Sequence, residues 1–453
     1  MKIIHGIRSH RVVTPEGVRP ATVLIRKGVI QGIFPYNTFP SDRYIHDAGE
    51  SVVMPGLVDT HVHINEPGRT DWEGFHTATR AAAAGGVTTL IDMPLNSIPA
   101  TTTVASLEIK RSAAYKKCWV NVGFWGGVVP GNTGDLQSLH HAGVFGFKCF
   151  LVPSGVPEFE HVGEADLRVA LPKLSELGVP LLVHAELPGP IEEATRKLAK
   201  SNPEKYKTWL LSRPPNAETK ATQLMIRLAG EFNARVHIVH LSSAHSVPLI
   251  RRAKKQGVLI TAETCPHYLF FAANSIRSGR TEYKCAPPIR DLRNSEKLWT
   301  ALEKNTLDFV VSDHSPSPPA MKHLRSGDFF KAWGGISSLQ LGLPAMWTKF
   351  SKRDFSLRHL VRWMCSGPAR LAGLDKHKGS IAIGYDADIV VWNPEEQFVV
   401  RPKMLQHRHK LTPYLKQTLH GVVEATFLRG EMIYDRGRFL GAPRGELLRR
   451  GER

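Results

Sequence analysis

Two histidines, His61 and His63, stand two residues apart at the end of an apolar run that opens after a Pro-Gly pair. The run, residues 57–64, predicts a buried strand, and on a strand this spacing turns both imidazoles to the same side. Two neutral imidazoles on one side of a strand can bind a divalent metal ion. The other such pair, His407 and His409, lies in a basic, polar segment without a strand pattern, and we interpret it as a chance repeat.

One histidine pair is equally compatible with a structural role, so further ligands must come from other elements. Between residues 56 and 375, apolar strand-like runs alternate with helix-like segments, several of which stop at a glycine. Eight strands with helices between them predict a (β/α)8 barrel, the TIM-barrel form of the α/β class. The predicted strands are residues 57–64, 87–93, 119–124, 144–151, 179–184, 235–241, 258–263 and 307–313.

Short β segments flank this middle part at both ends of the chain. Residues 22–34 and 424–434 each predict a hairpin, with turns at Lys27-Gly28 and Arg429-Gly430, and residues 387–392 predict a further strand. We therefore expect a small β-sandwich domain built from residues 1–55 and 376–453, beside a catalytic barrel of residues 56–375.

Nitrogen and oxygen donors stand at the ends of several predicted strands. His184, His240 and Asp313 end the fifth, sixth and eighth strands, and His61 and His63 end the first. Active sites of such barrels lie at the C-terminal ends of the strands, so these side chains are expected to converge there. Any one of them alone would be an ordinary buried polar group. Four histidines and an aspartate together are the donor set of a borderline divalent metal.

Lys148, at the end of the fourth strand, differs from these donors in charge. An ammonium group would repel a metal ion, and a lysine buried beside metal ions should lose its charge. If carbon dioxide carboxylated the amine, the side chain would present two anionic oxygens and could bridge two ions. The sequence gives only the position of this lysine.

Five short motifs carry a resemblance to a known family. They are Gly56-Leu-Val-Asp-Thr-His-Val-His63, Gly146-Phe-Lys-Cys149, Val183-His-Ala-Glu186, Val239-His-Leu-Ser242 and Ser312-Asp-His-Ser-Pro316. Together they resemble the amidohydrolase superfamily, and within it the cyclic amidohydrolases. Residues 65–74, 92–99, 264–269 and 284–290 are most similar to the allantoinase family of that group, and the resemblance covers nearly the whole chain.

The resemblance implies two divalent metal ions per subunit, zinc first, with cobalt, manganese or iron as alternatives. It places one ion on His61, His63 and Asp313 and the other on His184 and His240, with N6-carboxylated Lys148 as the bridge. The implied reaction is hydrolytic opening of the hydantoin ring of allantoin to allantoate. A hydroxide held between the ions attacks the ring carbonyl, and Asp313 carries its proton to the leaving nitrogen.

Four positions bear on the substrate. Asn65 stands where dihydroorotases usually carry an arginine that pairs with the substrate carboxylate, which favours an uncharged substrate. Asn96 is expected to hydrogen-bond the substrate, although a turn-forming role before Pro99 is an equal alternative. Backbone groups at Ala286 and Gly335 are expected to hold the ring amide. Ala286 also departs from the serine common in relatives, which bears on the substrate and not on the hydrolytic chemistry.

Other functions compete with this interpretation. Hydantoinase or dihydropyrimidinase activity, or dihydroorotase-like activity, would use the same chemistry on another ring, whereas a non-catalytic scaffold of this fold would lack the ligands.

The basic residues behind the net charge of +18 are scattered along the sequence, so we expect no nucleic-acid partner. No apolar run is long enough to cross a membrane. Five widely spaced cysteines and the absence of a signal-peptide pattern predict a cytoplasmic protein. The resemblance implies a homotetramer or homodimer.

Overall fold

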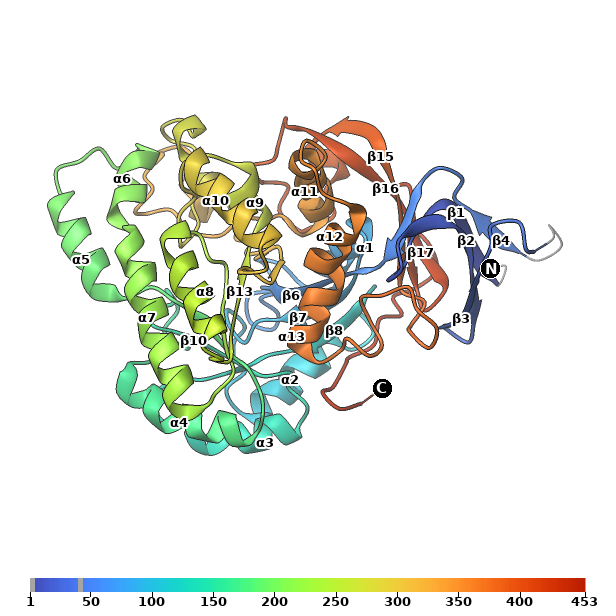
Figure 1. Ribbon diagram of the computed structural model, residues 1–453. Helices are drawn as coiled ribbons and strands as arrows, with labels where there is room; N and C mark the ends of the chain where they lie inside the picture. The colour runs from blue at the N-terminus through green and yellow to red at the C-terminus, as the bar shows by residue number, and fades with distance from the viewer. Residues whose placement is uncertain (1–4, 40–43, 453) are drawn as a thin grey trace.

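A closed barrel of parallel strands forms the larger part of the molecule (Figure 1). The computed structural model describes residues 5–39 and 44–452. The barrel strands are β6 (Leu57–Val62), β7 (Val87–Asp92), β8 (Asn121–Phe124), β9 (Gly126–Gly127), β10 (Phe147–Phe150), β11 (Leu181–His184), β12 (Val236–Ile238), β13 (Ile260–Thr264) and β14 (Phe309–Val310). They confirm the predicted barrel, with each predicted strand present and most of them shorter than the apolar run that predicted it.

Two short connections join the parallel ladders into a ring. Only Trp125 separates β8 from β9, and the Phe145 N–H donates to the Phe124 carbonyl at 3.0 Å, which continues the sheet toward β10. On the other side, Val62 pairs with His314 in a parallel bridge, and the His63 N–H donates to the His314 carbonyl at 2.8 Å. The first strand and the segment after the eighth strand therefore close the barrel.

Helices cover the outside of the barrel (Figure 1). In α7 the buried positions Ala217, Ala221, Met225 and Leu228 recur at helical spacing and form the face toward the barrel. The helices are α1 (Phe75–Ala84), α2 (Val104–Ala114), α3 (Leu136–His141), α4 (Glu164–Glu176), α5 (Pro188–Lys197), α6 (Tyr206–Ser212), α7 (Pro215–Phe232), α8 (Val247–Lys255), α9 (Pro266–Phe270), α10 (Leu292–Glu303), α11 (Gly342–Phe350), α12 (Leu357–Val361) and α13 (Gly367–Ala372). Among the residues described, no helix is both long and apolar enough to cross a bilayer.

Within the described residues, the two ends of the chain form one sheet of nine strands. These are β1 (Gly6–Val13), β2 (Val18–Arg26), β3 (Val29–Phe34), β4 (Ile45–Asp47), β5 (Val52–Pro55), β15 (Ile389–Val399), β16 (Thr418–Leu428), β17 (Glu431–Asp435) and β18 (Arg438–Phe439). Antiparallel pairing of β5 with β15 joins the N-terminal half to the C-terminal half. Both expected hairpins are present, and the two residues of each turn have positive φ, as tight hairpin turns require.

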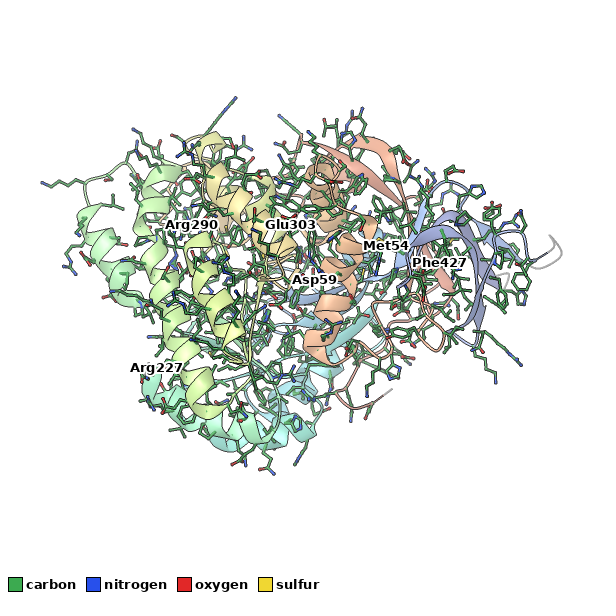
Figure 2. All side chains as sticks on the ribbon, in the orientation of Figure 1. Met54, Asp59, Arg227, Arg290, Glu303 and Phe427 are labelled. Atoms are coloured by element: carbon green, nitrogen blue, oxygen red, sulfur yellow. The ribbon has the colours of Figure 1, made fainter. Side chains whose placement is uncertain are left out.

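The two halves of this sheet enclose a small core. Ile25 from the N-terminal half and Phe427 from the C-terminal half belong to the same buried cluster, and a Cβ at Gly430 would lie 2.6 Å from the Ile25 side chain. The contact gives the sheet its sandwich-like form. Side chains alternate along β15, so that Val391 enters this core while Trp392 packs into the core of the barrel. Figure 2 shows Phe427 at the end of the molecule formed by the terminal sheet.

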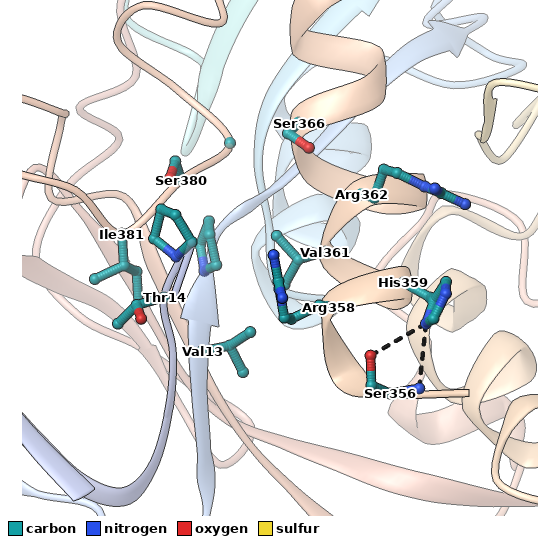
Figure 3. A pocket seen from close by; sticks show the side chains of 13 residues that line it. Val13, Thr14, Ser356, Arg358, His359, Val361, Arg362, Ser366, Ser380 and Ile381 are labelled. Carbon is teal, nitrogen blue, oxygen red and sulfur yellow. Dashed lines mark hydrogen bonds between the residues drawn. The ribbon is translucent and has the colours of Figure 1, made fainter. Parts of the chain in front are cut away.

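A cavity of about 390 Å³ lies at the seam between this sheet and the barrel (Figure 3). Val13 and Thr14 line it from β1 and the residue after it, and Pro55 lines it from the segment that leads into β6. On the barrel side, the Ser356 N–H donates to His359 Nδ1 at 3.2 Å. The seam cavity therefore lies at the N-terminal end of β6, opposite the strand end that carries His61 and His63.

Candidate metal centre

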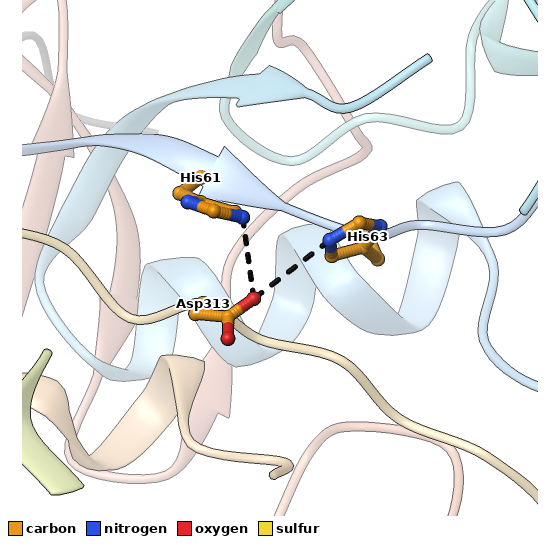
Figure 4. Close-up of side chains that lie close together, drawn as sticks. All are labelled: His61, His63 and Asp313. Atoms are coloured by element: carbon orange, nitrogen blue, oxygen red, sulfur yellow. Dashed lines mark ion pairs between the residues drawn. The ribbon is translucent and has the colours of Figure 1, made fainter. Parts of the chain in front are cut away.

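His61, His63 and Asp313 converge at the C-terminal ends of the barrel strands (Figure 4). Asp313 Oδ1 lies 3.3 Å from His61 Nε2 and 3.7 Å from His63 Nε2. All three side chains are buried. The two imidazoles point to the same side of the strand, as their spacing predicts, and the spacing of the three donor atoms suits ligands around one ion.

His184 and His240 complete a cluster of four imidazoles. Their ring centroids are 4.6 Å apart, and the ring of His240 lies 5.2 Å from that of His61. Phe150 stacks on His184 from the other side, with centroids 4.7 Å apart. The structure therefore brings together the four histidines that stand far apart in the sequence.

His240 and Asp313 lie outside the strands that were expected to carry them. β12 ends at Ile238 and β14 at Val310, and both residues follow in a left-handed backbone conformation, with φ of 37° for His240 and 45° for Asp313. Such angles are uncommon for residues other than glycine. The chain thus turns after each strand, and the turn directs the side chain over the mouth of the barrel.

Lys148 lies in β10 and is fully buried. Its Nζ has no hydrogen-bond partner among the described residues, and it lies 4.7 Å from the centre of the Phe150 ring. Burial lowers the pKa of Lys148 to about 8, although the carboxylates of Glu263 and Asp313 act in the opposite direction. A buried amine without a partner is an incomplete site, because buried polar groups ordinarily have partners.

The buried donor set fits divalent metal ions. Besides Lys148 Nζ, the Nδ1 atoms of His63 and His240 lack partners in the described part of the chain. Burial and nearby positive charge hold the pKa values of both imidazoles well below their usual range, so both rings are neutral. Neutral imidazoles and a carboxylate are the ligands that zinc and similar metals take.

A cavity of about 360 Å³ gives access to this cluster. Asn96, Ala286 and Gly335 line it, as expected for substrate-contacting positions. The N–H of Gly335 already donates to the Lys284 carbonyl at 2.8 Å. The Gly335 carbonyl accepts from Lys322 Nζ, so only its second lone pair could accept a hydrogen bond from a substrate. Further wall residues are Leu95, Phe150, Trp209, Arg213, Lys284, Cys285, Phe330 and Trp333.

Asn65 is not one of the residues that line the cavity. It is fully buried, and its Oδ1 accepts a hydrogen bond from Asn96 Nδ2 at 3.0 Å. Its own Nδ2 donates to the Pro316 carbonyl at 3.4 Å. Asn65 therefore lies behind Asn96 and orients it, with a backbone φ of 66°. The part that Asn65 plays in substrate binding stays a prediction.

Comparison with known proteins places the chain in a family. The model of the amidohydrolase family matches residues 52–433. The chain belongs to the amidohydrolase family. Family membership, together with the grouped histidines and aspartate, suggests a binuclear divalent metal site in this amidohydrolase.

Two kinds of relatives resemble this amidohydrolase over nearly its whole length. Allantoinase from Streptomyces avermitilis is 51% identical over 445 residues, which cover 98% of each chain. Allantoinase from Saccharomyces cerevisiae is 42% identical and covers 95% of each chain. Among solved structures, L-hydantoinase (dihydropyrimidinase) from Arthrobacter aurescens superimposes with a TM-score of 0.93 at 29% identity, covering 99% of this chain and 100% of that one.

Glu263 is a functional candidate that the sequence analysis missed. Its Oε1 accepts from His61 Nδ1 at 2.6 Å, and its Oε2 accepts from His237 Nε2 at 3.0 Å. Burial would raise the pKa of Glu263, but His61 and His237 outweigh it and hold that pKa at about 2. The ionised carboxylate only accepts, so His61 Nδ1 carries the proton and His61 Nε2 stays free to face Asp313. Glu263 ends the predicted seventh strand, so the strand-end argument could have found it.

Glu186 plays the equivalent part beside His184. Its Oε2 accepts from His184 Nε2 at 2.8 Å and lies 3.1 Å from a guanidinium nitrogen of Arg213. Burial lowers the pKa of His184 to about 4, although Glu186 acts in the opposite direction. The His184 ring is therefore neutral, with its proton on Nε2 and the lone pair of Nδ1 available to a ligand. The pattern Val183-His-Ala-Glu186 contained this residue without identifying its role.

His407 remains apart from the metal centre. Its ring lies 5.7 Å from that of His314, and His314 Nε2 lies 3.3 Å from a carboxylate oxygen of Glu73. None of these three residues lines the cavity over the metal centre.

Proposed function

We propose that the protein is a hydrolase that opens the hydantoin ring of allantoin and releases allantoate. One observation carries the proposal: four histidines, a lysine and an aspartate, which lie in or just after five different barrel strands, meet at the base of a cavity that can admit a small molecule. Allantoinases that match nearly the full length, at up to 51% identity, support allantoin over other cyclic amides.

We propose two zinc ions as the metals. His61, His63 and Asp313 would hold one ion, His184 and His240 the other, and N6-carboxylated Lys148 would bridge them. The unpartnered Lys148 Nζ, buried beside these donors, supports the modification. When bound, such ions lower the pKa of a coordinated water and polarise a carbonyl oxygen, which supplies a nucleophile at neutral pH.

Asp313 is the proposed proton carrier. Burial raises the pKa of its carboxyl group, which favours uptake of a proton by this group. Ser315 Oγ donates to Asp313 Oδ1 at 2.9 Å and fixes the orientation of the carboxylate. Asp313 accepts the proton of the attacking water and transfers it to the ring nitrogen as the carbon–nitrogen bond breaks, so the leaving group departs neutral.

The substrate is proposed to lie between Asn96 on one wall and the backbone of Ala286 and Gly335 on the other. All three line the cavity, and Asn65 supports Asn96 from behind. Because Asn65 carries no charge where dihydroorotases place an arginine, an uncharged ring is favoured. No nucleic-acid or membrane partner is proposed.

The proposal also covers the domain boundaries, the oligomeric state and the location of the protein. We assign residues 1–55 and 376–453 to one domain and residues 56–375 to the other, following the pairing of β5 with β15. A homotetramer or homodimer is proposed by analogy with the resembling family. A cytoplasmic location is proposed because the five cysteines are free and buried.

A substrate panel combined with metal quantification tests the proposal. Purified protein is assayed on allantoin, hydantoin, dihydrouracil and dihydroorotate, and bound metals are counted. Allantoin is expected to have the highest kcat/KM, with about two divalent ions per chain. The structural likeness to a hydantoinase makes hydantoin the relevant competitor. Faster turnover of hydantoin or dihydrouracil would replace the allantoin proposal, and fewer than one ion per chain would favour a scaffold.

A further inference from the structure

A second group of metal-type donors lies directly beside the proposed catalytic metal centre. Cys265 follows β13, His267 lies in the first turn of α9, and Asp313 follows β14. Donor atoms of these three side chains all lie within 4.8 Å of one another, and all three residues are buried. Donor atoms of His61, His63 and Asp313 also lie within 4.8 Å of one another. One sulfur, one nitrogen and one oxygen donor at this spacing form a three-ligand set for a metal ion.

His267 is the independent sign that this group has a ligand. The residue is fully buried, yet neither of its ring nitrogens has a hydrogen-bond partner in the described part of the chain. Buried side-chain nitrogens ordinarily have partners, and an exception needs an explanation such as an ion. A metal ion between His267, Cys265 and Asp313 would occupy one of these nitrogens.

We propose that Cys265, His267 and Asp313 form a second, inhibitory metal site for a thiophilic divalent ion such as cadmium, or zinc in excess of the catalytic ions. A cysteine sulfur selects softer metals, and one nitrogen and one oxygen complete a set that such ions accept. On binding, the Cys265 thiol releases its proton to solvent as the sulfur–metal bond forms, without oxidation or reduction.

Of the three proposed ligands, Asp313 lines the cavity over the catalytic centre, whereas Cys265 and His267 are fully buried behind it. Asp313 and Cys285 line that cavity, so the shared carboxylate is accessible from solvent. An ion held by Cys265 and His267 engages the carboxylate that must otherwise move a proton. The binding part of this inference stands alone, whereas the inhibition part rests on the proposed role of Asp313.

Cadmium titration of the metal-loaded enzyme tests both parts. Enzyme freed of excess metal receives cadmium chloride while thiolate-to-cadmium absorption, bound cadmium, retained catalytic metal and allantoin hydrolysis are measured. We expect one additional cadmium per chain, a new thiolate absorption band and at least about a tenfold loss of rate, with the catalytic metal retained. Cadmium uptake equal to the loss of catalytic metal, without the absorption band, would overturn the proposal.

Three variants make the assignment specific. Cys265→Ser and His267→Gln are expected to hydrolyse allantoin near the wild-type rate and to require at least about tenfold more cadmium for inhibition. Cys365→Ser is the matched control, because Cys365 is another buried free cysteine and its sulfur contacts the Pro55 carbonyl, away from the cluster. The control should retain both the absorption band and the inhibition.

The remaining outcomes also decide the question. An unchanged absorption band in Cys265→Ser, or unchanged cadmium sensitivity in both variants, would refute the site. If Cys265→Ser does not fold, His267→Gln and the wild-type absorption band give the answer. If the protein proves inactive on allantoin, absorption and cadmium stoichiometry still test binding, so failure of the proposed function is distinguishable from failure of this site.

Discussion

Lys148 presents a buried amine, unpartnered among the described residues, at the position of the proposed bridging ligand, and chemical rescue tests whether that amine is carboxylated. Replacing Lys148 with alanine is expected to abolish hydrolysis, because the bridge between the proposed metal positions is lost. A short carboxylate such as propionate should partly restore the rate, since it supplies two anionic oxygens in the space left by the side chain. The measurement is kcat with and without added propionate. Absence of rescue, at unchanged metal content, would argue against a carbamate.

Asp313 is the residue whose substitution separates proton transfer from folding. Asp313→Asn keeps the size of the side chain but removes its ability to accept a proton. A general acid–base group typically contributes about 10²- to 10⁴-fold to the rate, and a fall in kcat of that size is expected. Thermal unfolding should show an intact fold. Ser315→Ala, which removes only the hydrogen bond to Asp313, should give a smaller loss; a near-wild-type rate in Asp313→Asn would exclude the proton-carrier role.

Residue type and position in a strand were enough to predict part of this site. His61 is the last residue but one of β6, His184 ends β11 and Lys148 lies within β10, so their side-chain directions follow from strand geometry. His240 and Asp313 were expected beside the other donors, and the structure places them there, but their left-handed backbone was not predictable, because residue types other than glycine give little signal for positive φ. Which of them bind metal and what each does to the substrate stay predictions.

At the scale of single elements, β13 supplies the support for the ligands of its neighbours. Glu263 stands between His61 and His237, and His237 Nδ1 lies 2.7 Å from Thr261 Oγ1. His237 also stacks on Phe309 with ring centroids 5.1 Å apart. The sequence analysis could not predict this chain of contacts, since it depends on how strands β12, β13 and β6 face one another across the barrel.

Replacing His237, the residue of this contact network farthest from the proposed metals, should weaken metal binding without removing a ligand. His237→Phe keeps an aromatic ring against Phe309 but loses the hydrogen bond to Glu263, so Glu263 and His61 become less firmly oriented. Loss of such a supporting contact typically lowers metal affinity about 10- to 100-fold. Activity of the metal-free enzyme is measured against added zinc, and the variant should recover its rate at higher zinc. Thr261→Val is the milder control. An unchanged zinc requirement would show that His237 only fills space.

Across the whole molecule, the order of elements was predictable and the long-range pairing was not. Alternating strands and helices predicted the barrel, and two turn sequences predicted the terminal hairpins. The register of Val52 opposite Trp392 follows from no local pattern, because more than three hundred residues separate them. No local pattern predicts the closure of the barrel either, where the Ser312 N–H donates to a carboxylate oxygen of Asp59 at 3.0 Å.

The closure of the barrel between β6 and the segment after β14 makes metal removal a test at the scale of the whole molecule. At this closure Val62 pairs with His314 in an isolated bridge and not in a continuous ladder. His61 and His63 lie on one side of the closure, and Asp313 lies on the other. An ion bound across it should stabilise the closed barrel; at one hundred times its dissociation constant, a ligand stabilises the folded state by about 2.7 kcal/mol. Chelation should therefore lower Tm and speed amide exchange in residues 57–64 and 309–316. Exchange in β2 and β3, which lie in the terminal sheet, should change little, and a uniform increase over both regions would mean that the ion does not act at the closure.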